Sequence, residues 1–524
     1  MFNIKRIICG ALAAITALSL ASCRKADEGY VAGGELVVIQ DYSDIRLGVY
    51  GIDTLNPIAT KSESVQKITN IVYESLFTID ESGKEVPMLA YSYDVSADGK
   101  QIEVTLKNNV KWHDGQNFTA EDVAYTLSKM KESGGLYSNI SSKIHSFTAT
   151  DKNTIIINFE KEEPSPAHLL TFPIISRNAY YSESADFTPI GTGSYKFISK
   201  SGTDIVLEPN SRWHEGNVSE RKIIVKILKD KNAVLEAFNV GEIDAITSDE
   251  LSSGATPKSN SSSKSMVSDR LVFLGFNTAS PVMTKAVRKA INESLDRKKI
   301  VEKDAYGQGM AAEISINPES WVMVKDANKT TGSYPEDFME TDGYVIKDGV
   351  YHKDDVRLTI RLLVNSDNVE RSMLADSMAS TLKTAGFDVV LEKTSYQEYT
   401  AKIGSDDFDM FIGETEVGNN LNPAAMLTGD SNYFNFDASH IKTAMSRICG
   451  VSDKDEIKVQ IGEFITMFYI DPPYLPLYFK TENVIYGSYV SGIEKPVSFD
   501  PYKCIEKWYF YDKDGKESKG NADE

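Results

Sequence analysis

Residues 111–123 of the chain read KWHDGQNFTAEDV. Residues 112–115 read Trp-His-Asp-Gly, and the aspartate followed by glycine is typical of a tight turn. Thr119 is then placed to cap a helix, since Asp122 follows three residues later and apolar residues recur beyond it. Residues 102–107, just before the turn, alternate apolar and polar side chains as a half-buried strand does. The segment therefore predicts a strand, a turn and a helix in that order.

The rest of the chain continues this mixture of strands and helices. Residues 155–159 and 223–227 are rich in β-branched side chains and predict two further strands. Apolar residues at helical spacing predict three helices. Their inward faces are Val65, Ile68, Val72 and Leu76; Val287, Ile291 and Leu295; and Leu374, Met378 and Leu382, with Gly386 placed to end the last helix. The predicted fold class is α/β, without repeats or heptads.

Two polar segments interrupt the pattern. Residues 252–270 are rich in Ser, Lys and Asn and predict a mobile loop. Residues 321–355 are polar, with Gly and Tyr, and predict an insertion or a long connection. Neither segment has the composition of a linker between independent modules.

The first residues predict an export signal. Lys5 and Arg6 precede an apolar run over residues 7–20, which is shorter than the ~20 apolar residues of a membrane span. The run ends in Leu20-Ala21-Ser22-Cys23, which resembles a bacterial lipoprotein signal, cleaved before a cysteine that carries a diacylglyceryl group. An ordinary signal peptide with an incidental cysteine is the alternative. We expect residues 1–22 to be the signal peptide, residues 23–34 a flexible tether, and the protein to be anchored outside the cytoplasm through Cys23.

Length and charge exclude several classes of protein. The 524 residues are too many for one core, so two or three domains are expected. The formal net charge of −20 argues against nucleic acid as a partner, and against attraction to anionic lipid. No apolar run after the leader is long enough to span a bilayer.

Two of the four cysteines lie in or at the end of the leader, at Cys9 and Cys23. Cys449 and Cys504 remain, and in an exported protein they can form a disulfide. The alternative is that both are reduced and buried, and the sequence does not decide between the two.

Several motifs follow one another in the order of a known family. Residues 111–123 resemble its pattern of a Lys-aromatic-His-Asp-Gly turn, then Phe-Thr-Ala, then Asp-Val. Further elements that resemble it are Leu55-Asn56-Pro57, Tyr73-Glu74-Ser75-Leu76-Phe77, Pro189-Ile190-Gly191-Thr192-Gly193-Ser194-Tyr195, Gly241-Glu242-Ile243-Asp244, Phe276-Asn277 and Pro473-Tyr474-Leu475-Pro476-Leu477-Tyr478. Over residues 42–490 the chain is similar to the peptide/nickel family of extracellular solute-binding proteins, which includes the dipeptide- and oligopeptide-binding proteins.

The resemblance implies a two-lobed periplasmic-binding-protein-like fold with an additional third domain and a hinge between the lobes. Residues 35–60, 185–270 and 485–524 would form lobe 1, residues 61–184 the extra domain, and residues 271–484 lobe 2. Ligand would bind between the lobes and be buried by their closure. His113 and Asp114, and the Gly-Thr-Gly element, are expected to hold turns rather than ligand.

The resemblance also implies where ligand contacts lie. In peptide-binding relatives a Gly-Asp-Pro element of lobe 2 supplies an aspartate to the peptide's α-amino group, and the matching position here is Asn422, which carries no charge. Lys61 stands where some oligopeptide binders have an acidic residue. Glu414 or Glu416 is the candidate substitute for the missing carboxylate. The expected polar contacts are Lys61, Asn277, Glu414, Asn419 and Asn422, and the expected aromatic walls are Trp321, Tyr396 and Tyr433.

Other ligands and roles stay open at this point. The amide-rich loop with Asn419 and Asn422 also suits an oligosaccharide, and relatives that take nickel as a chelate need few protein ligands. A surface receptor for peptide signals would need the same lobe closure as an importer component. Peptide is preferred because it is the family's commonest ligand class, which is an argument from analogy.

An enzyme is the alternative of a different class. The chain has no Gly-x-Ser-x-Gly elbow, no His-Glu-x-x-His and no P-loop, and no cofactor motif. Its six histidines are scattered, with no two at metal-ligand spacing. We therefore expect a monomeric, non-catalytic binding protein without cofactor or metal, whose partners are a peptide or another small molecule and the subunits of an ABC permease.

Overall fold

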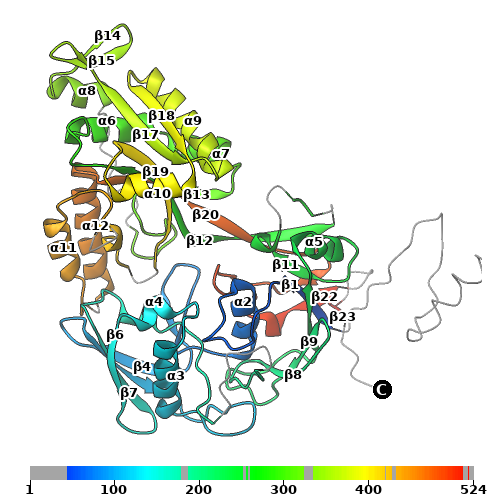
Figure 1. The fold of residues 1–524 in the computed structure, drawn as a ribbon. Coiled ribbons are helices and arrows are strands. Elements are labelled where there is room, and N and C mark those ends of the chain that lie inside the picture. Colours follow the sequence, from blue (N-terminus) through cyan, green and yellow to red (C-terminus); the bar gives the residue numbers. More distant parts are fainter. Residues whose placement is uncertain are drawn as a thin grey trace, which may run out of the picture. The chain divides into compact units, whose positions relative to one another are not determined.

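The computed structural model describes residues 44–178, 187–251, 255–257, 260–323, 334–418, 421–427, 432–451, 453–511 and 517–518 (Figure 1). The expected signal peptide, Cys23, the tether and Asn419 lie outside the described residues. None of the helices in the described ranges is long and apolar enough to cross a membrane.

The largest sheet has eleven strands in the order β18-β17-β19-β12-β20-β11-β1-β10-β9-β8, with β13 paired to β20. Its strands are β1 (Ile45–Tyr50), β8 (Tyr195–Ser201), β9 (Asp204–Pro209), β10 (Ile223–Leu228), β11 (Ala245–Thr247), β12 (Ser261–Phe276), β13 (Gly309–Ala311), β17 (Thr359–Asn365), β18 (Asp388–Thr394), β19 (Met410–Glu416) and β20 (Tyr474–Gly487). We call β1 and β8–β11 the β1 half of this sheet, and β17–β19 the β17 half.

Two long antiparallel strands, β12 and β20, belong to both halves (Figure 1). The first part of β12, residues 261–267, pairs with the end of β20, which also pairs with β11. The second part pairs with β19 and with the beginning of β20. A register shift between Val267 and Leu271 separates the two parts. The chain therefore passes between the halves along this strand pair.

The start of β12 corrects one prediction from the sequence. Residues 252–270 were expected to be a mobile loop, but β12 begins at Ser261. The side chains of residues 262–265 are exposed on both faces of the strand. Backbone hydrogen bonds to β20 keep residues 261–267 in the strand. Because neither face is buried, the sequence lacks the alternation of apolar and polar residues that would have predicted a strand here.

The β17 half is built from strands joined by helices. β17 pairs in parallel with β18 and with β19, and the connections are α9 (Val369–Thr384) and α10 (Tyr396–Gly404). The predicted inward face of α9 is confirmed, because Leu374, Met378 and Leu382 are buried. Gly386 follows the helix with φ of +93°, a conformation that favours glycine. Alternate residues of β12 belong to separate hydrophobic clusters, so both faces of this half are covered.

The β1 half has the same strand–helix–strand connection. β1 pairs in parallel with β10 and β11, and α5 (Lys231–Asn239) joins β10 to β11. Val234 and Phe238 of α5 pack with Ile243 and Ile246 in one cluster. The predicted strand over residues 223–227 is β10.

Residues 111–123 follow a strand of a separate four-stranded sheet. Its order is β4-β5-β7-β6, with β4 (Ala90–Val95), β5 (Gln101–Leu106), β6 (Ile144–Ala149) and β7 (Thr154–Phe159). Strand β5 alternates buried and exposed residues, as predicted. Helix α3 (Ala120–Glu132) begins after Thr119, whose N–H donates to Asp122 Oδ2 at 2.9 Å. The predicted strand, turn and helix are therefore confirmed.

The remaining elements are helices and short strands outside the two sheets described above. The predicted insertion over residues 321–355 holds α8 (Pro335–Thr341) and most of the sheet of β14 (Val345–Lys347), β15 (Val350–Lys353) and β16 (Val356–Arg357). The others are α2 (Glu63–Val72), α4 (Ser138–Ser141), α6 (Lys285–Ser294), α7 (Arg297–Lys303), α11 (Ser439–Ser446), α12 (Lys454–Ile470), β2 (Phe77–Ile79), β3 (Glu85–Pro87), β21 (Val490–Ser491), β22 (Tyr509–Tyr511) and β23 (Glu517–Ser518). Of these, α2 buries Val65, Ile68 and Val72 and α6 buries Val287 and Ile291, as predicted. Leu76 and Leu295 are also buried but lie beyond the ends of these helices.

Candidate functional site

Topology locates a candidate site in the β17 half. The parallel strands β17, β18 and β19 end at Asn365, Thr394 and Glu416, at one edge of the sheet. Helices α9 and α10 begin directly after two of these strands, with Asn368 and Ser395 as their N-caps. Ligands of open α/β sheets bind outside the carboxyl ends of the strands. The side chains at this edge are therefore the first candidates.

The β1 half presents a turn at the corresponding place. After β1, the Asp53 carboxylate accepts hydrogen bonds from the Thr54 and Lys61 N–H groups and from the Thr60 hydroxyl. Partial burial opposes ionisation, but these hydrogen bonds outweigh it and lower the pKa of Asp53. The turn leads into α2 and leaves the Lys61 side chain exposed.

Between the halves, the register shift of β12 forms a bulge at residues 268–270. The Ser268 hydroxyl donates to Lys480 O at 2.9 Å and accepts from the Arg270 N–H at 3.3 Å. The Val417 N–H, just after β19, donates to Asp269 O at 2.8 Å. A bulge bends its strand and redirects side chains. It places Asp269 and Arg270 between the two halves of the sheet.

Arg270 connects elements on both sides of this bulge. Its guanidinium lies 2.9 Å from Glu63, at the start of α2, and 3.9 Å from Glu416, at the end of β19. On the β1 side, Lys67 forms an ion pair with Asp249 and donates to the Thr247 hydroxyl at 3.0 Å.

Carboxyl groups outnumber the cations around the bulge. Burial raises the pKa of Asp269 to about 6, and the negative charge of Glu416 adds to this effect. Burial likewise raises the pKa of Glu482, on β20, to about 7, with a further contribution from Asp249. The cluster can therefore take up protons close to neutral pH, or interact favourably with a positive charge.

A second charged group lies at the carboxyl edge of the β17 half. Glu414 on β19 is 3.0 Å from Lys480 and 4.0 Å from Arg371, and Lys480 is 3.6 Å from Glu370. The Arg371 Nε is buried with no hydrogen-bond partner among the described residues. Sequence reasoning missed Arg371 and Lys480. The available signal for Arg371 was a basic residue in the first turn of a helix that directly follows a strand.

The backbone of β19 has an unpaired stretch beside this group. Because the Val417 N–H bonds to β12, and successive residues of a strand point to opposite sides, the backbone groups of Glu414 and Glu416 point away from β12. On that side β17 pairs only with Met410 and Phe411, and the Tyr399 hydroxyl donates to Ile412 O at 2.9 Å. Among the described residues, no strand pairs with Glu414 and Glu416 on this side.

Two of the residues predicted from the sequence, Glu414 and Tyr396, lie at this edge. Glu414 belongs to the charged group, and Tyr396, at the start of α10, is 61% exposed. Asn422 is half-buried, in a turn where its carbonyl accepts from the Ala425 N–H. Tyr433 is 50% exposed, but the carbonyl of the next residue, Phe434, accepts from the Thr278 N–H beyond the end of β12, so Tyr433 lies at the opposite end of β19. Asn419 lies outside the described residues.

Two other predicted residues have internal partners. Asn277 is 5% exposed. Its amide group donates to Asp406 O and Phe408 O, and its carbonyl accepts from the Ala279 N–H and the Asn435 amide. These bonds use the whole hydrogen-bonding capacity of the side chain, so Asn277 holds a turn in this structure.

Trp321 also packs against the protein itself. Its backbone N–H donates to Ser82 O at 2.8 Å, in the β2–β3 turn, and its ring lies 5.9 Å from Lys454 Nζ. Its indole Nε1 is buried and has no partner among the described residues. Trp321 therefore contributes to a contact between segments rather than to the β19 edge.

The His-Asp-Gly turn is structural, as expected. The His113 Nδ1 accepts from the Gly191 N–H at 3.2 Å, so the protonated Nε2 faces Gly193 O at 3.0 Å. Burial lowers the pKa of His113 to about 4, which keeps the ring neutral. The turn thus holds the Gly-Thr-Gly element in place.

Both remaining cysteines are free thiols, Cys449 buried and Cys504 half-buried. Of the two alternatives that the sequence left open, the structure has the one without a disulfide.

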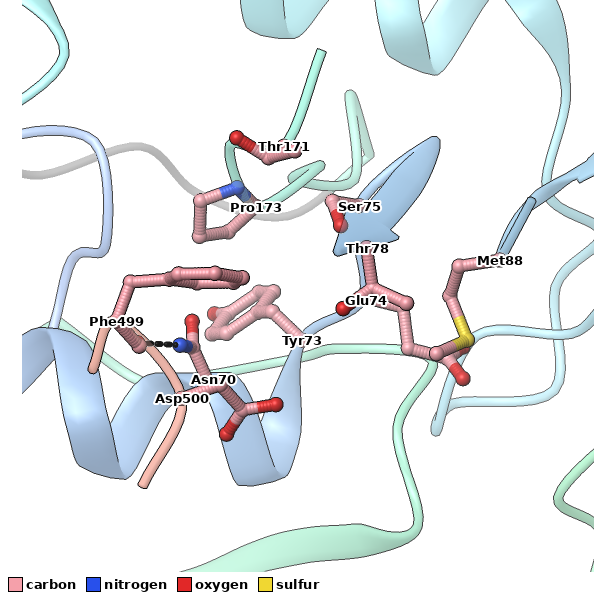
Figure 2. A pocket seen from close by; sticks show the side chains of 10 residues that line it. All are labelled: Asn70, Tyr73, Glu74, Ser75, Thr78, Met88, Thr171, Pro173, Phe499 and Asp500. Atoms are coloured by element: carbon pink, nitrogen blue, oxygen red, sulfur yellow. Dashed lines mark hydrogen bonds between the residues drawn. The ribbon is translucent and has the colours of Figure 1, made fainter. Parts of the chain in front are cut away.

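A small cavity lies elsewhere, at the end of α2 (Figure 2). It has a volume of about 50 Å³. It is lined by Asn70, Tyr73, Glu74, Ser75, Thr78, Met88, Thr171, Pro173, Phe499 and Asp500. The Asn70 amide donates to Phe499 O at 2.7 Å, and Glu74 accepts from Trp213 Nε1 at 2.9 Å. This space suits a few water molecules and is too small for a peptide. No group of three or more potential metal ligands occurs within the described ranges.

Comparison with known proteins gives one consistent result. Residues 84–435 match the family model of bacterial extracellular solute-binding proteins, family 5 Middle. The oligopeptide-binding protein AppA of Bacillus subtilis is 26% identical over 513 residues, covering 90% of this chain and 92% of the relative. The unliganded open form of MppA, a periplasmic murein tripeptide-binding protein, has a similar fold, with a TM-score of 0.77 at 17% identity over 90% of this chain and 98% of that one. NikZ of Campylobacter jejuni, in complex with Ni(L-His), gives a TM-score of 0.62 at 21% identity, covering 89% and 99%.

Proposed function

The chain belongs to family 5 of the bacterial extracellular solute-binding proteins, and we propose that it captures peptides outside the cytoplasm and delivers them to an ABC permease. Its relatives are solute-binding proteins of transport systems rather than enzymes, and two are named oligopeptide-binding proteins. The role is therefore binding without catalysis.

The unpaired stretch of β19 is the observation that carries the peptide assignment. An extended peptide can add to an open strand edge through main-chain hydrogen bonds, and such bonds do not depend on its side chains. The backbone groups of Glu414 and Glu416 offer this edge at the carboxyl end of the sheet. A ligand with regularly spaced amide groups suits it better than a sugar or a metal chelate does.

The charges near the edge support the same class of ligand. A free peptide has an ammonium group at one end and a carboxylate at the other. Glu416 is exposed and supplies the carboxylate that Asn422 lacks, while Arg371 and Lys480 are the cations available to a peptide carboxylate. Charge-assisted hydrogen bonds of this kind are stronger than neutral ones. Tyr396, Tyr433 and Lys61 are further contacts in this proposal.

The domain division is also part of the proposal. Lobe 1 takes residues 35–60, 185–270 and 485–524, the extra domain residues 61–184, and lobe 2 residues 271–484. Peptide binds between the lobes and stabilises their closed arrangement because it contacts both. A lipid group on Cys23 keeps the monomeric protein at the membrane near its permease.

Native mass spectrometry of the purified full chain, followed by denaturation, tests the ligand class. We expect a ladder of co-purified peptides to be released. Release of a single oligosaccharide or a metal chelate would refute the peptide assignment and leave the family membership intact. If the protein is empty, a defined library of free peptides is titrated, and failure to bind any of them is the negative result.

A peptide identified in this way then tests the edge itself. N-methylation of one peptide nitrogen at a time removes one main-chain donor at a time. We expect at least a tenfold loss of affinity at alternate positions only, because a strand presents alternate residues to its neighbour. Losses at every position, or at none, would contradict strand addition on β19.

Matched variants test the charges. Glu416→Gln should weaken binding of a free peptide more than that of its N-acetylated form, and Arg371→Gln should distinguish the free from the C-amidated form. The exposed Glu302 on α7 is remote in sequence from these elements, so Glu302→Gln serves as the control with unchanged affinity.

A further inference from the structure

The small cavity at the end of α2 joins parts of the chain that are far apart in sequence (Figure 2). Its lining comes mainly from residues between 70 and 78, from residues 171–173, and from Phe499 and Asp500 after β21. The Asn70 amide holds the last of these segments against α2 through its 2.7 Å hydrogen bond to Phe499 O. The proposed peptide site uses none of these residues.

Most polar groups in the lining present oxygen atoms that can still accept. The hydroxyls of Ser75 and Thr171 each donate their proton to a backbone carbonyl, at 2.5 and 3.3 Å, so their lone pairs remain. The nitrogen of the Asn70 amide donates to Phe499 O, which leaves its carbonyl oxygen as an acceptor. A cavity lined in this way favours a ligand that donates hydrogen bonds or carries positive charge.

Two further groups in the lining lack partners. Thr78 is 8% exposed, and its hydroxyl has no hydrogen-bond partner among the described residues. Within the same part of the chain, the Asp500 carboxylate has neither a hydrogen bond nor an ion pair. Burial raises the pKa of Asp500 to about 7; Lys503 opposes this shift and Glu506 adds to it. Buried polar groups are normally satisfied, so a ligand that contacts both groups would remove a cost to the folded state.

The number of unpaired charges favours a single positive charge on this ligand. The second carboxylate of the lining, Glu74, already accepts from Trp213 Nε1 at 2.9 Å and lies 2.9 Å from His214 Nε2. Asp500 is left with neutral oxygens around it. Ca²⁺ takes about 6–8 oxygen ligands, commonly with several carboxylates, and Mg²⁺ dehydrates reluctantly. A monovalent cation therefore suits the lining better than a divalent one.

Size and aromatic side chains narrow the choice further. The volume of about 50 Å³ admits an ion about as large as a water molecule, with little accompanying water. The rings of Tyr73 and Phe499 also line the cavity (Figure 2), and aromatic faces attract cations that have shed their water. K⁺ and ammonium meet these conditions, since both are near water in size and weakly hydrated.

We propose that this cavity binds one monovalent cation of the size of K⁺ or ammonium, held by the Asp500 carboxylate, the Thr78 hydroxyl and the Asn70 carbonyl oxygen. The ion ties the segment at Phe499 and Asp500 to α2 and β2. It stabilises the folded protein because only the folded chain assembles the site. This site is independent of the peptide ligand.

Thermal unfolding of the full chain at pH 8, where the Asp500 carboxyl is ionised, tests the proposal. KCl, NH4Cl and choline chloride are compared at equal ionic strength. We expect the melting temperature in KCl or NH4Cl to exceed that in choline chloride by about 2–4 °C, and the larger of the two shifts identifies the ion. Equal melting temperatures in all three salts would mean that the cavity holds water only and would overturn the proposal. A larger specific shift with CaCl2 would overturn the monovalent assignment.

Variants of the lining locate the effect. Asp500→Asn and Thr78→Val should each abolish the difference between the salts. Asp94→Asn is the matched control, because Asp94 is an exposed carboxylate on β4, and it should keep the full difference. Retention of the difference in Asp500→Asn, or its loss in Asp94→Asn, would refute the site.

A direct measurement does not depend on the variants being folded. Rb⁺ is close to K⁺ in size and scatters anomalously, so crystals of the original chain grown with RbCl should give an anomalous difference peak beside Thr78 and Asp500. Absence of a peak at this position would refute the proposal.

Discussion

The guanidinium of Arg270 lies 2.9 Å from the carboxylate of Glu63, a residue 207 positions earlier in the chain. The same guanidinium is 3.9 Å from Glu416. Glu63 begins the helix that follows β1, whereas Glu416 ends β19. One side chain in the bulge of β12 therefore contacts both α2 and the end of β19, and a movement of α2 against the β17 half must change these distances.

Arg270→Gln should loosen the connection between the halves at little cost in stability. The ion pair is partly exposed, so its loss lowers the free energy of unfolding by less than about 1 kcal/mol. We expect the radius of gyration of the unliganded protein to increase in small-angle X-ray scattering. Arg357→Gln is the control, since it removes the exposed Arg357–Asp388 pair between β16 and β18. An equal increase in the control would contradict this prediction.

Stability should depend on pH through Glu482. Burial and Asp249 raise its pKa to about 7, so the folded protein holds this proton more tightly than the unfolded chain does. The resulting stabilisation is present in full below the ordinary carboxyl pKa and is lost as the pH rises through 7. Glu482→Gln replaces the carboxyl by a neutral amide, so the folded protein no longer bears the free-energy cost of ionising a buried carboxyl at high pH.

We therefore expect Glu482→Gln to increase the free energy of unfolding by about 1–3 kcal/mol at pH 8 and to change it little at pH 5. Thermal unfolding at both pH values measures this. Glu302→Gln, at an exposed position, should have no such difference. If Glu482→Gln increased the free energy of unfolding equally at pH 5 and pH 8, the Glu482 carboxyl would have the same ionisation state at both pH values. That result would contradict the prediction.

Asn277 and Asn422 should respond in opposite ways to replacement by alanine. Asn277→Ala leaves the carbonyls of Asp406 and Phe408 without their donor, at a cost of about 2–4 kcal/mol. It should leave the affinity for peptide unchanged. Asn422→Ala should weaken peptide binding by several-fold and change the unfolding midpoint little. Urea denaturation measures the change in stability of both variants, and calorimetric titration measures the change in affinity. The reverse pattern would mean that Asn277 contacts the peptide and that Asn422 is structural.

Gly191→Ala should destabilise the protein severely. A Cβ atom at this position would lie 1.9 Å from Val72 O, and the Gly191 carbonyl accepts from the His113 N–H at 2.9 Å. Backbone must move to admit the methyl group, at a cost of about 3 kcal/mol or more. Gly134→Ala has open space and should stay within about 0.5 kcal/mol of the original protein. Comparison of soluble yield and melting temperature is sufficient to test this.

Local signals explain what the sequence predicted well. The alternation of apolar and polar residues over 102–107 predicted β5 correctly, because one face of that strand is buried and the other is more exposed. The pairing of Thr119 with Asp122 marked the start of α3, since both partners lie within one helical turn. Motif order then indicated the family, which the match over residues 84–435 establishes.

Long-range contacts explain what the sequence did not predict. The first part of β12 is held by its partner strand rather than by its side chains, so it has the composition of a loop. The charges around Arg270 come from α2, β12, β19 and β20, and no local pattern joins them. Asn277 was assigned to ligand by analogy, although its partners at Asp406 and Phe408 lie some 130 residues later.

The pairing of β12 with β20 has a consequence for how such proteins diversify. The chain enters the β17 half along β12 and leaves it along β20, and Gly275 is paired with Tyr474 where the two strands run together. The β17 half is thus an insertion with adjacent ends, the arrangement in which modules are exchanged most readily. A segment spanning residues 268–482 could be transplanted between relatives through two junctions in one strand pair. The recipient would keep its own β1 half and acquire the β19 edge of the donor.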